Sequence, residues 1–85
     1  MKTEEVILNF IREELLRGDG QVSVDPSTSL ISTGILDSLA LLKLLLFIEE
    51  RFSLKVNDGE VNPRNFETVN RITAFIESKR KEEAR

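Results

Sequence analysis

The sequence predicts an all-α fold, a four-helix bundle of three longer helices and one short helix with a long first loop. Apolar residues recur at helical spacing in three separate stretches, and Gly, Pro, Asn and Asp residues interrupt the pattern between them. The chain has 85 residues, of which 40% are hydrophobic, which is enough for one small core. We therefore expect residues 1–85 to form a single domain.

The first helix is expected to begin at Thr3, whose side chain can cap a helix, with Glu4 and Glu5 in the first turn, where negative charge favours the helix dipole. Gly18 is expected to end this helix, because glycine tolerates the left-handed backbone that follows many helices. The apolar side chains between these points follow helical spacing: Val6, Ile7, Phe10, Ile11 and Leu15.

A long connection runs from Gly18 to Asp37. Asp25-Pro26 is typical of a turn, and Gly34 permits a tight or left-handed backbone just before the next helix. Because the loop is long for a small domain, it should be functional or held by its own apolar side chains. We expect it to cross the bundle from end to end. Five apolar residues can provide them: Val22, Val24, Leu30, Ile31 and Ile35.

The second helix is expected to begin at Asp37 or Ser38, either of which can be its N-cap, and to run to about Phe52. A buried strand is the alternative, but the length and the leucine content favour a helix. Asn62-Pro63 predicts the start of a short helical turn over residues 63–66.

Thr68 is expected to cap the last helix, and a flexible charged tail is expected from about residue 79 to residue 85. One face of that helix carries four apolar residues: Val69, Ile72, Phe75 and Ile76.

The composition argues against catalysis by the chain itself. The sequence contains no cysteine and no histidine, so it has no disulfide, no thiolate nucleophile, no Cys-based metal site and no Ser-His-Asp mechanism. We expect no catalytic residues, no metal site and no enzymatic activity. The net charge of −3 also argues against nucleic acid as a partner, because nucleic-acid-binding proteins present basic patches.

The apolar segments do not predict a membrane protein. The longest runs from Leu39 to Ile48, is interrupted by Lys43, and is too short to span a bilayer. The N-terminus is acidic soon after its start and lacks the apolar run of a signal peptide. We therefore expect a cytoplasmic protein, and a monomer.

The predicted second helix carries two apolar faces, although a surface helix needs only one. At 100° per residue, Leu42, Lys43, Leu46 and Glu50 lie within about 60° of Leu39. A broader group lies at about 200° and is the expected core face: Leu41, Leu44, Leu45, Ile48 and Phe52. The surplus face is either covered by the long loop or exposed as a partner site. Lys43 favours exposure, because its ammonium group must reach water.

Ser38 opens this helix, and a serine in that position is most often only a cap. Its setting is more specific, because Gly34-Ile35-Leu36-Asp37-Ser38-Leu39 resembles the phosphopantetheine attachment motif of acyl and peptidyl carrier proteins. The resemblance covers nearly the whole chain. It includes Glu49-Glu50-Arg51-Phe52 at the end of the second helix and Phe66-Glu67-Thr68-Val69 before the last one.

The resemblance implies an acyl-carrier-protein-like bundle with a covalent cofactor. Ser38 would carry 4′-phosphopantetheine, whose thiol holds an acyl or aminoacyl group as a thioester, so the chain would need no cysteine of its own. Asp37 would belong to the motif recognised by a phosphopantetheinyl transferase, or would act only as a second cap. The surplus face would bind an adenylating or acyl-loading enzyme and the downstream synthase or tailoring enzymes, through Leu39, Leu42, Lys43, Leu46 and Glu50.

The charge of the second helix indicates the kind of carrier. Lys43 stands where fatty-acid carriers commonly have a carboxylate, which favours a specialised pathway of the polyketide or nonribosomal peptide type. A housekeeping fatty-acid carrier and a D-alanyl carrier are the alternatives within the family. Outside it, a helical protein-interaction module would use Asp37 and Ser38 only as caps, and a small carboxylate-dependent enzyme is a further alternative.

Overall fold

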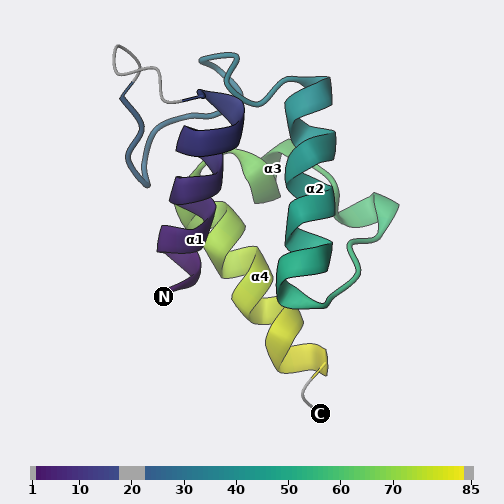
Figure 1. Ribbon diagram of the computed structural model, residues 1–85. Helices are drawn as coiled ribbons and strands as arrows, with labels where there is room; N and C mark the ends of the chain where they lie inside the picture. Colours follow the sequence, from purple (N-terminus) through teal and green to yellow (C-terminus); the bar gives the residue numbers. More distant parts are fainter. Residues whose placement is uncertain (1, 18–22, 84–85) are drawn as a thin grey trace.

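The computed structural model describes residues 2–17 and 23–83, and it confirms the all-helical fold. Three longer helical segments and one short helix are present, with no strand in the described residues (Figure 1). The elements are α1 (Thr3–Phe10) with its π-helical extension η1 (Ile11–Leu15), α2 (Ser38–Phe52), the 3₁₀ turn η2 (Asp58–Glu60), α3 (Pro63–Phe66) and α4 (Val69–Glu83). In Figure 1, α1 runs upward and both α2 and α4 run downward.

The start of α1 differs from the sequence prediction. The N-cap is Lys2, which makes no side-chain capping bond, and Thr3 is the first helical residue. The Thr3 side chain is buried, and its hydroxyl donates a hydrogen bond to the Glu77 carboxylate on α4. Thr3 therefore does not cap α1 but links it to α4, because the packing of the two helices brings an acceptor within reach.

The structure describes the first helical segment and the residues that follow it as far as Arg17. Helical structure continues to Leu15 as predicted, but its last turn widens, and the Leu16 N–H donates to the Ile11 carbonyl. Arg17 already has a left-handed backbone, with φ of 50°. The stop predicted at Gly18 lies outside the described residues.

The long loop does not cross the bundle, which corrects the sequence prediction. The end of η1 and the start of α2, which the loop connects, lie at the same end of the molecule (Figure 1). Two backbone hydrogen bonds attach the loop to the α3–α4 junction, from Leu30 N–H to the Glu67 carbonyl and from Asn70 N–H to the Pro26 carbonyl. The turn at Asp25 is confirmed, because the Thr28 N–H donates to the Asp25 carbonyl.

The side chains that hold the loop are partly those predicted. Val24 and Leu30 are buried, and Ile35 packs against the core while partly exposed. Ile31 is instead exposed, so its predicted role in the core is wrong, and Leu36 is buried although it was not singled out. Val22 lies outside the described residues.

The core confirms which face of α2 points inward. Leu44 and Ile48 are fully buried, and the other members of the predicted core face, Leu41, Leu45 and Phe52, are half-buried at its margins. From the other helices the core takes Ile7, Ile11, Phe66, Val69, Ile72 and Ile76. Phe75 packs at the edge, with its ring 5.5 Å from that of Phe66.

The last helix extends further than the sequence predicted. Its start is as expected, since the Thr68 hydroxyl accepts a hydrogen bond from the Arg71 N–H. It then continues through Lys79 to Glu83, so most of the segment predicted as a tail is helical, and residues 84–85 lie outside the described residues. Lys79 is only 9% exposed and pairs with Glu60, a contact that no local pattern indicates. None of the helices described is long and apolar enough to cross a membrane.

Candidate functional site

At the N-terminus of α2, the capping group comes from Asp37 and not from Ser38. Asp37 has an extended backbone, and its Oδ1 accepts a hydrogen bond of 2.8 Å from the Ala40 N–H, so Asp37 is the N-cap. Ser38 is the first helical residue and is exposed. No side-chain hydrogen bond joins Ser38 to another residue in the described part of the chain. The cap of α2 therefore does not depend on the Ser38 hydroxyl.

The residues before Asp37 fix where the helix starts. Gly34 has a φ of 79°, which only glycine adopts without strain, and its N–H donates to the Ile31 carbonyl. The buried Leu36 then donates its N–H to the Leu30 carbonyl at 2.8 Å. The loop thus closes on itself immediately before the helix, with Leu36 inside and Ser38 outside.

Two pockets flank this point. The pocket on the α3 side has a volume of about 350 Å³, and Ser38 itself forms part of its wall. Its other lining residues are Ile31, Leu36, Asp37, Leu41, Val61, Asn62, Pro63 and Phe66. This wall is mainly apolar. The exposure of Ile31 is explained by its position in this wall.

The second pocket lies on the α1 side and has a volume of about 470 Å³. It lies between the end of the first helical segment and the start of α2, and its walls include Leu15, Arg17, Leu39 and Lys43. The sequence indicated neither pocket, because their walls come from segments far apart in the chain.

The surplus apolar face of α2 is exposed. Leu39 is 62% exposed, Leu42 53% and Leu46 57%, so the long loop does not cover them. Lys43 and Glu50 are exposed on the same side of the helix. The structure therefore brings all five predicted partner-binding residues to one open surface, the α2 face, which begins directly after Ser38.

Comparison with known proteins identifies the family. A family model described as a phosphopantetheine attachment site matches residues 5–76. The chain belongs to the phosphopantetheine-binding carrier proteins. This family is not catalytic, and a phosphopantetheine attachment site is present in this carrier.

Similar proteins cover the carrier almost completely. A D-alanyl carrier protein of Lactobacillus acidophilus is 30% identical over 78 residues, which are 92% of this carrier and 95% of that protein. The solution structure of a holo acyl carrier protein from Nitrosomonas europaea has a TM-score of 0.77 at 28% identity and covers 95% of this carrier and 99% of that chain. The apo structure of KstB-PCP has a TM-score of 0.75 at 33% identity and covers 92% and 86%. The acyl-carrier-protein-like fold is thereby confirmed.

Proposed function

We propose that this carrier holds an acyl or aminoacyl group as a thioester on 4′-phosphopantetheine attached to Ser38 and presents it to partner enzymes. The start of α2 supports this proposal. Asp37 caps the helix, and the exposed Ser38 hydroxyl has no hydrogen-bond partner among the described residues. The backbone N–H groups and the positive dipole end of α2 favour a phosphodiester anion there. The prosthetic group supplies the thiol that the chain lacks.

A direct measurement tests the attachment. The purified protein is incubated with coenzyme A, magnesium and a broad-specificity phosphopantetheinyl transferase, and its intact mass is recorded. We expect a gain of one phosphopantetheine, because the transferase meets both an exposed serine and Asp37 of the recognition motif. An unchanged mass would contradict the proposal and would favour a helical interaction module.

The α2 face supports a partner interface. Three exposed leucines provide apolar contact area, and Lys43 and Glu50 provide a charged rim at its border. We infer that a loading enzyme of the adenylating or acyl-transferring kind and later synthase or tailoring enzymes bind here in turn. We also propose that residues 1–85 act as one carrier domain in these encounters.

The pathway is proposed from the charge of this face. Lys43 disfavours a partner with a basic docking patch, which supports a specialised biosynthetic pathway over housekeeping fatty-acid synthesis. D-alanine transfer is a second candidate, because the similar protein from Lactobacillus acidophilus is a D-alanyl carrier. Loading assays on the holo-protein distinguish the two: a D-alanine-activating ligase should add mass only if the second candidate is correct.

Lys43→Glu should impair loading and leave attachment intact. The transferase acts at Asp37 and Ser38, whereas Lys43 lies more than one turn further along the exposed face, where a carboxylate would repel the group that pairs with lysine. The rate of loading by the native enzyme is measured on holo-protein. Lys81→Glu, the same change at an exposed site on α4, is the control. Equal loading of Lys43→Glu and the parent would remove Lys43 from the interface.

A further inference from the structure

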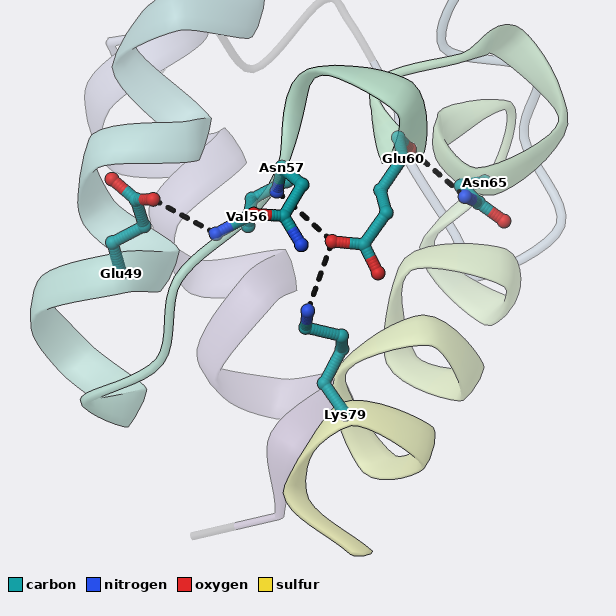
Figure 2. Close-up of polar contacts among 6 residues, drawn as sticks. All are labelled: Glu49, Val56, Asn57, Glu60, Asn65 and Lys79. Atoms are coloured by element: carbon teal, nitrogen blue, oxygen red, sulfur yellow. Dashed lines mark hydrogen bonds and ion pairs between the residues drawn. The ribbon is translucent and has the colours of Figure 1, made fainter. Parts of the chain in front are cut away.

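A polar cluster centred on Glu60 connects the segment before α3 to two helices (Figure 2). Glu60 Oε1 accepts hydrogen bonds of 2.9 Å from the Asn57 N–H and from Lys79 Nζ on α4. The Glu60 N–H in turn donates to the Asn57 backbone carbonyl at 2.9 Å, which closes the turn η2. The Glu60 carbonyl accepts from Asn65 Nδ2 on α3, also at 2.9 Å. One residue thus joins α4, η2 and α3.

The Glu60 carboxylate of this cluster is held in its charged form. The Asn57 N–H bond and then the Lys79 ammonium keep the pKa of the Glu60 carboxyl below its ordinary value. Lys79 is 9% exposed, and a buried lysine is costly unless it is paired and hydrogen-bonded. The pairing with Glu60 therefore offsets part of the cost of burying the Lys79 ammonium group.

The segment after Glu60 forms a wall of the pocket beside Ser38. Val61, Asn62 and Pro63 line that pocket, and none of the three is buried. The wall is attached at its far end by Phe66, which is fully buried in the core. At its near end it is attached through Glu60, so its position relies on one apolar and one polar anchor.

We propose that Lys79 is a positioning residue that, through Glu60, holds the α3-side wall of the Ser38 pocket closed over the bound cargo. The ion pair lies towards the C-terminal end of α4, whereas the pocket lies at the start of α2, so the anchor acts through the backbone of Glu60 and the three residues that follow it. The shielding of a thioester by this wall rests on the proposed function. The anchoring of the wall by Lys79 is independent of that function.

Amide hydrogen exchange on the apo-protein tests the anchor. Lys79→Met keeps the length and the apolar stem but removes the ammonium group, and Lys81→Met is the matched control at an exposed site on the same helix. We expect exchange of the Val61, Asn62 and Asn65 amides to accelerate by about tenfold in Lys79→Met, which corresponds to the loss of one charge-assisted hydrogen bond. Exchange of the Ile7 and Ile72 amides should stay unchanged. The proposal would be overturned if amide exchange accelerated throughout the chain, or if it accelerated in neither variant.

Glu60→Gln removes the same ion pair by changing its other partner, and it is a second test of the anchor. It keeps an acceptor for the Asn57 N–H and removes the negative charge opposite Lys79, so it should reproduce the local acceleration. A Glu60→Gln protein that exchanges like the parent would contradict the anchor even if Lys79→Met failed to fold.

Thioester reactivity tests the shielding. The transferase and hexanoyl-coenzyme A would install a hexanoyl-bearing arm on the parent, Lys79→Met and Lys81→Met, and hydroxylamine cleavage would be followed by intact mass. Cleavage should be several-fold faster in Lys79→Met alone. Equal cleavage rates together with faster local exchange would overturn the shielding role. No mass gain in any protein would instead contradict the proposed function, while the exchange data would still decide the anchor.

Discussion

Ser38→Ala is expected to abolish phosphopantetheine attachment completely while leaving the fold intact. The variant removes the hydroxyl that would form the phosphodiester, but no capping hydrogen bond, because Asp37 rather than Ser38 accepts the Ala40 N–H. The melting temperature should therefore match that of the parent. Intact mass after incubation with coenzyme A and the transferase measures the attachment, and thermal unfolding by circular dichroism measures the fold.

Ser78→Ala is the matched control, since Ser78 is an exposed serine on α4, away from the motif. It should gain one phosphopantetheine as the parent does. A mass gain that persisted in Ser38→Ala would place the attachment on another hydroxyl. A folded Ser38→Ala protein without the mass gain, beside a modified Ser78→Ala protein, would establish Ser38 as the attachment site.

Leu44→Ala should produce the largest loss of stability among the single changes considered. Leu44 is fully buried within the core, and a leucine-to-alanine change at such a site costs about 2–5 kcal/mol in the free energy of unfolding. A domain of this size has little stability to lose, so part of the variant should be unfolded at room temperature. Urea unfolding followed by circular dichroism measures the effect.

Leu42→Ala is the matched control, two residues earlier in the same helix. Leu42 is 53% exposed on the α2 face, so its truncation should change the free energy of unfolding by no more than about 0.5 kcal/mol. It should instead weaken loading by the partner enzyme, because it removes apolar contact area. Equal destabilisation by both variants would contradict the assignment of the two faces.

Much of the fold follows from local patterns. The 100° advance per residue separated the two faces of α2, and the structure buries Leu44 and Ile48 while exposing Leu39, Leu42 and Leu46. Turn and capping residues placed α3 at Pro63 and the start of α4 after Thr68. These predictions succeeded because helix boundaries and helix faces depend on residues only three or four positions apart.

The errors of prediction share a different cause. Thr3 is a good cap by type, but helix packing places Glu77 within reach of its hydroxyl. Lys79 lies in a charged segment typical of a solvated tail, but Glu60, 19 positions earlier, pairs with it. Ile31 was expected in the core and instead lines the pocket beside Ser38. Each outcome depends on a residue that is distant in the sequence.

The sequence by itself determined the helices, the core face of α2 and the motif around Ser38, because spacing and residue type within a few positions decide these features. Only the tertiary structure decided which of Asp37 and Ser38 caps α2, where the pocket beside Ser38 lies, and that Lys79 pairs with Glu60. The physical reason is that a pocket and a buried ion pair need groups from separate segments at fixed positions. Those positions are set when the whole core packs.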